Sequence, residues 1–400
     1  KPVGAVCNLD CTYCFYLSKD SLYPDRSLRM GHDTLEAYLA QLLESQPDGP
    51  VTIAWQGGEP TLIGIDFFAE AVKLAHRLAR PGQVIEHTIQ TNGTLIDEEW
   101  GQFFFDNNFL VGLSIDGPAP MHDAFRVWKN GRGSHADAVR AWHVLTERAV
   151  ETNILCSLHA ANVDDPLVVY RYLRDELGAK YLQFIPIVER TTVEQVATAE
   201  SGWKNETSKR RILYRQNGDL VTSRSVSGRA YGQFLSTIFD EWVRRDVGTI
   251  FVQMFDVTLG AHLNQYSLCI HAPTCGRALA MEHNGDVYAC DHYVEPSYLL
   301  GNLHDTPMSD LAASPVQVAF GRAKQQSLPR QCRECSVLFA CHGGCPKDRF
   351  APSPEGRHDL NHLCDGLYSF FTHTQPTMSK MAELLRSGRD ADEIMAMLET

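Results

Sequence analysis

The twelve cysteines of this 400-residue chain constrain its fold more than any other feature, because they form two groups and leave one residue isolated. Three lie near the N-terminus, eight lie between residues 269 and 364, and Cys156 lies between the groups. Disulfide frameworks are typical of small secreted domains without a sufficient core, whereas 44% of this chain is hydrophobic, which suits a sizeable core. The clustered thiols therefore favour metal ligation in a reducing cytoplasm. Cys156 lies in an apolar run and is interpreted as a buried, inert thiol.

The first group has the spacing C-x3-C-x2-C, formed by Cys7, Cys11 and Cys14, and is followed by Phe15 and Tyr16. Three thiolates on one short loop can hold one face of a cubane 4Fe–4S cluster. They leave one iron without a protein ligand, and an open position is typical of a catalytic rather than a structural metal site. A zinc site or a chance spacing is the alternative interpretation.

The second group consists of eight cysteines, which are enough to ligate two 4Fe–4S clusters fully. In chain order they are Cys269, Cys275, Cys290, Cys332, Cys335, Cys341, Cys345 and Cys364. A pair of structural zinc sites is the alternative, since four cysteines also suit zinc. The 16 histidines are scattered without ligand spacing, so none is assigned to a metal.

Between the two groups, strand-like runs alternate with helical periodicity from about residue 30 to 190. Strands are predicted at Val51–Trp55, Val84–Ile89, Phe109–Ile115, Asn153–Leu158 and Tyr181–Ile185. Helices are predicted around 34–45, 66–79, 97–107, 134–149 and 165–176. This order predicts a parallel sheet with right-handed crossovers. About six strands, the first just before Cys7 and largely outside the sequence, suit a partial α/β barrel better than the alternative, a doubly wound sheet.

Four segments are predicted along the chain. Residues 1–228 form the partial (β/α)6 barrel, with a polar insertion at about 190–228. Residues 229–268 form a helical connection, 269–375 a loop-rich and cysteine-rich domain, and 376–400 a C-terminal helix.

The insertion carries two smaller predictions. Asn217-Gly218 lies between the apolar pairs Leu213-Tyr214 and Leu220-Val221 and predicts a small hairpin. A basic stretch from Lys204 to Arg215 is interpreted as solvated.

Polar loops follow three of the predicted strands, where ligand-binding loops of α/β barrels lie. The first is Gln56-Gly57-Gly58-Glu59-Pro60, in which two glycines let the backbone approach a ligand and a carboxylate can accept from an ammonium. The others are Gln90–Thr94 and Ser114–Gly117. Ordinary turns are the alternative interpretation of all three.

Together, the cysteine loop and these strand ends resemble the radical S-adenosylmethionine (SAM) superfamily. In that family the open iron holds the amino and carboxylate groups of SAM, and a 5′-deoxyadenosyl radical is released from it. The resemblance implies that Gln56, Gly57, Gly58 and Glu59 bind the amino group of SAM. It also implies that Ser114 and a downstream arginine, Arg126 or Arg132, hold its carboxylate and ribose, with turn and surface roles as the alternative.

The second cysteine group resembles the SPASM domain, an extension found on peptide-modifying radical SAM enzymes. In that family the ligand sets of two auxiliary clusters interleave. The resemblance assigns Cys269, Cys275, Cys290 and Cys345 to the first auxiliary cluster. It assigns Cys332, Cys335, Cys341 and Cys364 to the second. Three 4Fe–4S clusters are therefore expected, and full ligation of the auxiliary pair suits electron transfer.

One segment narrows the reaction, because Asp291 directly follows Cys290 within Val287–Val294. With the other motifs, it resembles anaerobic sulfatase-maturating enzymes over nearly the whole chain. Those enzymes oxidise a cysteine or serine in the C/S-x-P-x-R motif of an unfolded or nascent sulfatase to Cα-formylglycine, without oxygen. The resemblance implies that Asp291 is the general base and that Tyr16 lines the pocket beside the cofactor. A ligand-orienting role for Asp291 and a core role for Tyr16 are the alternatives.

The same residues are also compatible with other functions. The runner-up is a SPASM radical SAM enzyme that forms a thioether or crosslink in a ribosomally synthesised precursor peptide. A non-catalytic electron carrier or zinc scaffold is a third, against which the open cluster and the Gly57–Glu59 loop argue. A net charge of −13 offers no basic face to nucleic acid, and no apolar run approaches the ~20 residues of a membrane span. A cytoplasmic enzyme with an electron donor such as ferredoxin or flavodoxin is expected.

Overall fold

The structure is a computed structural model that describes residues 1–23, 28–204 and 211–398. Its main feature within these ranges is a six-stranded sheet in the order β1-β2-β3-β4-β5-β8. The strands are β1 (Gly49–Trp55), β2 (Gln83–Thr91), β3 (Phe109–Ser114), β4 (Thr152–Leu158), β5 (Tyr181–Pro186) and β8 (Phe251–Val252). Every neighbouring pair is parallel, which requires crossover connections. The predicted α/β fold with a six-stranded partial barrel is confirmed.

One end of this sheet differs from the prediction. β8 lies within residues 229–268, where only a helical connection was predicted, and it pairs with β5. Two residues are too few to show a strand period, but the Tyr181 and Phe251 rings stack across the pair with centroids 5.1 Å apart. Residues 2–5 form turns, and the strand predicted before Cys7 was expected to lie largely outside the sequence.

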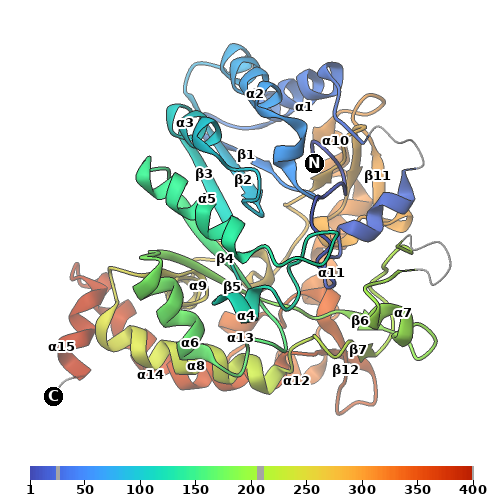
Figure 1. Ribbon diagram of the computed structural model, residues 1–400. Helices are drawn as coiled ribbons and strands as arrows, with labels where there is room; N and C mark the ends of the chain where they lie inside the picture. Colours follow the sequence, from blue (N-terminus) through green and yellow to red (C-terminus); the bar gives the residue numbers. More distant parts are fainter. Residues whose placement is uncertain (24–27, 205–210, 399–400) are drawn as a thin grey trace.

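Helices alternate with the strands and cover the outer side of the sheet (Figure 1). They are α1 (His32–Ser45), α2 (Ile65–Leu78), α3 (Glu98–Asp106), α4 (Ala119–His122), α5 (His135–Glu147) and α6 (Pro166–Arg171). The longer ones bury an apolar stripe, as α2 does with Phe68, Ala71 and Leu74. α3 begins after Asp97, whose carboxylate accepts hydrogen bonds from two backbone N–H groups of the first turn.

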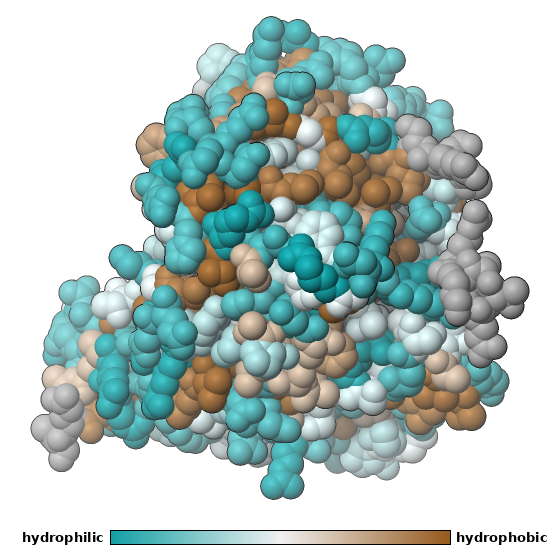
Figure 2. Space-filling model, viewed as in Figure 1, coloured by the Kyte–Doolittle hydropathy of each residue, from teal (hydrophilic) through white to brown (hydrophobic). Residues whose placement is uncertain are grey.

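Three helices from the second half of the chain extend the same core. They are α8 (Gly228–Arg245), α9 (Gln253–His262) and α14 (Cys364–Arg386). α8 and α14 meet at two glycines, because a Cβ atom on Gly232 would lie 2.5 Å from the Cα atom of Gly366. Figure 2 shows hydrophilic side chains over most of the outer helices in this view. None of the helices in the described ranges has the length and apolar character that a membrane crossing requires.

The last helix begins earlier than the predicted segment 376–400. α14 begins at Cys364 and continues through Pro376, and the short α15 (Ile394–Leu398) follows it. A proline removes one backbone hydrogen bond, but the buried side chains on both sides of it, including Phe370 and Met378, keep the helix continuous.

The cysteine-rich part is built from short elements joined by loops. Strands β9 (Ala280–Met281), β10 (Asp286–Tyr288) and β11 (Leu299–Asn302) form an antiparallel sheet, and β12 (Arg349–Pro352) pairs with β13 (His358–Asn361). The helices between them are α10 (Met308–Ala313), α11 (Pro315–Gln326), α12 (Arg330–Arg333) and α13 (Leu338–Cys341). A loop-rich region of this kind was predicted.

The insertion does not form the predicted hairpin. β6 (Arg190–Thr191) pairs with β7 (Leu220–Val221), and α7 (Val196–Glu200) lies between them. Leu213-Tyr214, expected to pair with β7, is outside any strand, because Tyr214 is buried in a small core of the insertion. Gly218 still turns the chain, with a φ of 89°, and a Cβ atom there would lie 2.1 Å from the Thr191 oxygen.

Candidate active site and cluster sites

The N-terminal cysteine loop is held against the glycine-rich turn that follows β1. The N–H of Gly58 donates to the carbonyl oxygen of Gly4 (2.9 Å), and the N–H of Glu59 donates to that of Val6 (2.8 Å). A Cβ atom on Gly58 would lie 2.1 Å from the Val6 oxygen. Glycine therefore permits the two backbones to approach closely, directly beside Cys7.

Glu59 is fully buried, and its carboxylate ties this turn to the end of β2. Oε1 accepts hydrogen bonds from the N–H and hydroxyl of Thr61 and from the Thr91 hydroxyl, whereas Oε2 accepts from the Asn92 N–H (2.7 Å). Burial raises the pKa of Glu59, and these hydrogen bonds oppose the rise. Oε2 keeps acceptor capacity for an ammonium group. Asn92 extends the network to Cys7, with 3.6 Å between Nδ2 and Sγ.

Asp116 holds the aromatic residue of the cysteine loop. The Tyr13 hydroxyl donates to Asp116 Oδ2 (2.6 Å), and Arg126 Nε donates to the same oxygen (2.7 Å). Burial opposes ionisation of Asp116, but the Arg126 guanidinium holds the pKa of that carboxyl well below its usual range. The guanidinium carbon lies 5.6 Å from the centre of the Tyr13 ring, a cation–π distance. Asp116 was not singled out from the sequence, although its position after a strand was a signal.

Of the two arginines considered for SAM binding, the structure brings Arg126 to this site. Arg132 is exposed and pairs with Asp137 at 2.8 Å instead. Ser114 is the last residue of β3 and is half-buried.

Asp291 comes from the cysteine-rich part but is held at the N-terminal loop. Lys1 Nζ lies 2.8 Å from Asp291 Oδ1, and the Tyr16 hydroxyl donates to Oδ2. That hydroxyl also lies 3.3 Å from Gln56 Oε1, and Lys1 pairs with Glu282 at 2.9 Å. Burial opposes ionisation of Asp291, but the Lys1 ammonium keeps its pKa below the ordinary value. The side chain remains 29% exposed, so a substrate can reach it.

The pKa values of Cys7 and Cys11 are raised by burial and by neighbouring thiolates. Cys7 and Cys11 are buried and Cys14 is half-buried. Burial raises the pKa of Cys11 to about 12, and the thiolate of Cys14 adds to the rise. Burial likewise raises the pKa of Cys7, and both other thiolates contribute. Thiols that disfavour one another's ionisation suit a site where bound iron supplies positive charge.

Cys290 shares electrostatic interactions with three other cysteines of the second group. Burial raises the pKa of Cys290 to about 11, and the thiolates of Cys269 and Cys275 add to the rise. Burial raises the pKa of Cys345 to about 12, with a contribution from Cys290. The SPASM resemblance implies that these four cysteines hold the first auxiliary cluster.

The other four cysteines form a second neighbourhood. Burial raises the pKa of Cys341 to about 11, and the thiolates of Cys332 and Cys335 add to the rise. Burial raises the pKa of Cys364 to about 12, and the thiolates of Cys341, Cys332 and Cys335 add to the rise. No three His, Cys, Asp or Glu side chains in the described ranges converge as they would around one metal ion. Four soft thiolate donors in each set fit a 4Fe–4S cluster.

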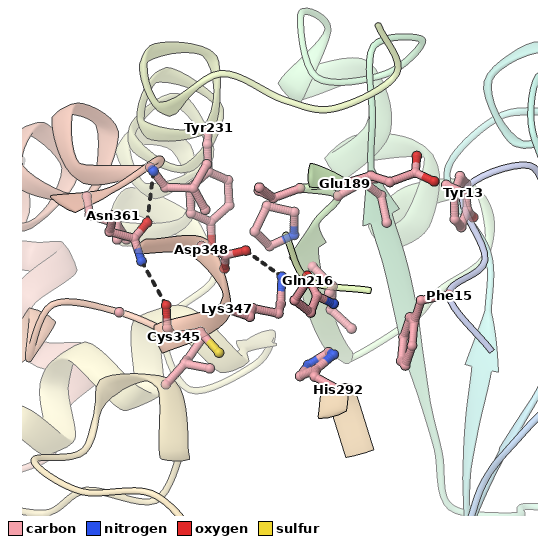
Figure 3. Close-up of a pocket in the computed structure, with 18 of the residues that line it drawn as sticks. Tyr13, Phe15, Glu189, Gln216, Tyr231, His292, Cys345, Lys347, Asp348 and Asn361 are labelled. Carbon is pink, nitrogen blue, oxygen red and sulfur yellow. Dashed lines mark hydrogen bonds and ion pairs between the residues drawn. The ribbon is translucent and has the colours of Figure 1, made fainter. Parts of the chain in front are cut away.

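A cavity of about 160 Å³ lies between the N-terminal loop and the cysteine-rich part (Figure 3). Tyr13 and Phe15 line one side, and Cys345 lines the other. The ion pair of Lys347 and Asp348 (Nζ to Oδ1, 2.6 Å) also faces it. The cavity thus lies between the first cysteine loop and Cys345.

The basic stretch of the insertion is not simply solvated. Lys204 Nζ and Arg211 Nη2 pair with the Asp10 carboxylate at 2.5 and 2.6 Å. Asp10 belongs to the N-terminal cysteine loop, and only the fold brings its charge to the insertion. Arg215 is exposed, and residues 209–210 lie outside the described ranges.

Comparison with known proteins identifies the family. The model of the radical SAM superfamily matches residues 2–173, and that of the SPASM iron–sulfur cluster-binding domain matches residues 269–336. The serine-type anaerobic sulfatase-maturating enzyme of Bacteroides thetaiotaomicron is 41% identical over 405 residues, which span all of this chain and 94% of that protein. The chain belongs to the anaerobic sulfatase-maturating enzymes. It is a radical SAM enzyme whose cofactors are SAM and three 4Fe–4S clusters.

Other relatives agree with this placement. The cysteine-type anaerobic sulfatase-maturating enzyme of Clostridium perfringens is 30% identical over 96% of this chain and 98% of that protein. A solved structure described as native anSMEcpe with bound AdoMet and Cp18Cys peptide has a TM-score of 0.81, with 30% identity, and covers 96% of this chain and 98% of that one. Streptococcus suis SuiB bound to S-adenosylmethionine has a TM-score of 0.58 at 13% identity over 90% of this chain and 75% of that one. That likeness shows the fold alone.

Proposed function

We propose that this chain oxidises a cysteine or serine side chain of a sulfatase polypeptide to Cα-formylglycine without oxygen, using SAM as the radical source. The target is an unfolded or nascent segment with the motif Cys/Ser-x-Pro-x-Arg. Relatives of both the serine type and the cysteine type match this chain over most of its length, so both targets are included.

The observation that carries the proposal is the position of Asp291. A carboxylate from the cysteine-rich part lies at the N-terminal cysteine loop, held by Lys1 and Tyr16. A general base must be within hydrogen-bond reach of the proton that it removes. Asp291 is ionised, partly exposed and next to Cys290, so it can take a proton where an auxiliary cluster can take an electron.

We assign the cluster ligands as the resemblance to radical SAM and SPASM proteins implies. Cys7, Cys11 and Cys14 would hold the cluster that binds SAM, with Gln56, Gly57, Gly58 and Glu59 beside it. Cys269, Cys275, Cys290 and Cys345 would hold the first auxiliary cluster. Cys332, Cys335, Cys341 and Cys364 would hold the second.

A reduced cluster held by Cys7, Cys11 and Cys14 would supply the electron that makes SAM a source of the radical, and this radical would take one hydrogen atom from the target Cβ. Asp291 then accepts the thiol or hydroxyl proton of the target, while Tyr16 and Lys1 orient its two oxygens. Glu59 and Asp116 fix the turns around the cysteine loop, and Tyr13 and Phe15 shield the cavity from water. Loss of one further electron completes a two-electron oxidation to the aldehyde, or to a thioaldehyde that water hydrolyses.

A one-electron carrier is needed to supply the first electron. We propose ferredoxin or flavodoxin as the donor and the cytoplasm as the compartment, because a reducing environment keeps twelve thiols available.

The test is anaerobic incubation of the reconstituted protein with SAM, dithionite and either of two peptides, carrying Cys-x-Pro-x-Arg or Ser-x-Pro-x-Arg. Mass spectrometry should show loss of two hydrogen atoms from the serine peptide. The cysteine peptide should lose two hydrogen atoms and exchange sulfur for oxygen.

Two outcomes would contradict the proposal. Cleavage of SAM with both peptides unchanged would indicate another substrate, such as a precursor peptide that is crosslinked. Purified protein with zinc instead of about twelve irons, four for each cubane, would exclude the radical reaction.

A further inference from the structure

Two cations are buried among the auxiliary cysteines. The Lys324 residue, on the inner face of α11, is 1% exposed, and Arg349, the first residue of β12, is 9% exposed. They are linked, because Arg349 Nη1 donates to the carbonyl oxygen of Lys324 (2.6 Å). An uncompensated buried charge is strongly destabilising, so each cation needs a nearby negative charge.

Their hydrogen bonds are all to neutral groups. Lys324 Nζ donates to three backbone carbonyls, those of Cys269, Ile270 and Ala272. Arg349 donates to the Ser327 hydroxyl and to four backbone carbonyls, those of Lys324, His342, Gly343 and Gly344. Within residues 1–23, 28–204 and 211–398, neither cation forms an ion pair with a carboxylate.

Both cations lie beside cysteines of the auxiliary sets. Lys324 Nζ lies 2.7 Å from the backbone oxygen of Cys269, and Gly321, earlier on the same helix, accepts a hydrogen bond from the Cys275 N–H (3.2 Å). Arg349 donates to the carbonyl groups of residues 342–344, which join Cys341 to Cys345. Lys324 therefore lies beside the first auxiliary set, and Arg349 lies at the turn that joins a cysteine of each set.

The backbone is shaped around the guanidinium group. His342, Gly343 and Gly344 have φ values of 48°, 72° and 60°, and their carbonyl groups all accept hydrogen bonds from Arg349. Left-handed backbone is uncommon for residues other than glycine, and a Cβ atom on Gly343 would lie 2.8 Å from Arg349 Nη2. The turn that carries Cys341 and Cys345 is thus built to hold a charge between the two thiol sets.

We propose that Lys324 and Arg349 are the internal counter-ions of the two auxiliary clusters, and that their charge raises the reduction potential of these clusters. Both are positioning residues, since they act on the substrate through the clusters. The inference rests on the ligand sets assigned under the proposed function.

The charge balance gives the reason. A 4Fe–4S core of charge 2+ bound by four thiolates is a dianion, and reduction adds one more negative charge in a buried site. In the proposed reaction the target radical loses one electron, its heteroatom loses one proton to Asp291, and a carbon–heteroatom double bond forms. The electron reduces an auxiliary cluster from 2+ to 1+, and a one-electron carrier such as ferredoxin or flavodoxin reoxidises it. Nearby cations favour the reduced form, so they favour this electron transfer.

The test compares charge with shape at residue 324. The change Lys324→Gln keeps two N–H donors for the same carbonyls and removes the charge, whereas Lys324→Arg keeps the charge. The readout is an anaerobic redox titration of the reconstituted proteins, followed by electron paramagnetic resonance of the auxiliary clusters. We expect Lys324→Gln to make reduction about tenfold less favourable, equal to 59 mV for one electron, and Lys324→Arg to stay near the wild-type potential.

Arg322→Gln is the matched control, because Arg322 lies on the same helix but is exposed to solvent, which screens its charge. Its clusters should titrate as in the wild type. The larger shift in Lys324→Gln should belong to the cluster of Cys269, Cys275, Cys290 and Cys345.

Iron analysis of each variant makes every outcome decisive. Full iron with an unchanged potential in Lys324→Gln would overturn the inference, as would an equal shift in Lys324→Arg. Loss of clusters in the glutamine variant but not in the arginine variant would support a counter-ion role, and loss in both would refute it. The titration needs no peptide, so failure of the wild type to oxidise a sulfatase peptide would count against the proposed function alone.

Discussion

At the scale of single residues, the proposed mechanism depends on Asp291 as the general base. The change Asp291→Asn keeps the size of the side chain but removes its capacity to take a proton. We expect SAM cleavage to continue and formylglycine formation to fall roughly 100-fold or more, the usual loss with a general base. Both products can be measured in one anaerobic assay by chromatography and mass spectrometry.

The control is Asp310→Asn, which changes an exposed carboxylate in the same part of the chain and should leave both products unchanged. If Asp291→Asn forms formylglycine at the wild-type rate, the base is another group.

Lys1 is a second prediction at this scale, since its ammonium lies between two carboxylates. Without this ammonium group, the carboxylates of Asp291 and Glu282 would both lose the ion pair that they form with Lys1. We expect Lys1→Met to lower kcat for the peptide about tenfold, the size of effect seen when a group that orients a reactive residue is lost. KM for SAM should not change.

Lys73→Met, on the exposed face of α2, is the matched control for loss of one positive charge. Equal losses in kcat and in SAM binding by Lys1→Met would indicate a general structural role instead.

Sequence reasoning reached some of these residues and not others, for a physical reason. Asp291 could be singled out from the sequence because it directly follows Cys290, a predicted cluster ligand. Lys1 and Glu282 are 281 positions apart, and neither belongs to a local pattern, so only the fold reveals the pair. The same is true of Lys324, because its helix has the sequence of an ordinary surface helix with two basic residues, Arg322 and Lys324.

At the scale of elements, the glycine-rich turn after β1 makes a sharp prediction. In Gly58→Ala the added methyl group would lie 2.1 Å from the Val6 oxygen, so the turn and the cysteine loop must separate. A displacement of about 1 Å at a reacting centre can cost 100-fold in rate. We expect SAM cleavage to fall by about that factor, measured as 5′-deoxyadenosine, while circular dichroism stays unchanged.

Gly31→Ala is the control, since a Cβ atom at Gly31 would meet nothing within 4 Å and its backbone φ is −82°. Normal SAM cleavage by Gly58→Ala would mean that the turn does not position the cofactor.

Elements were predictable from sequence where they are long and periodic. The five main strands and the helices between them follow from hydrophobic patterning. β8 has two residues and depends on the edge of β5, so no local pattern can reveal it. Tyr214 was expected to belong to one strand of the hairpin, but its ring is buried in the small core of the insertion.

At the scale of the whole molecule, the cysteine-rich part depends on its clusters more than the barrel does. One large core joins the sheet to α8, α9 and α14. Within residues 269–361 the separate apolar groups are small, such as Val287 with Leu303 and Leu311. Burial of so few side chains offsets little of the conformational entropy of a loop-rich region, so bound iron must supply much of its stability.

Iron removal should therefore act unevenly along the chain. We expect hydrogen exchange of the iron-free protein, measured by mass spectrometry, to lose protection across residues 269–361 while β2 to β4 remain protected. Cys345→Ala should reproduce part of this effect, because Cys345 lies four positions after Cys341 but is assigned to the other set. Its iron content should fall from about twelve to about eight per chain, with exchange rising near Cys269 and Cys290 as well as locally. Uniform loss of protection over the barrel would show instead that the clusters support the whole fold.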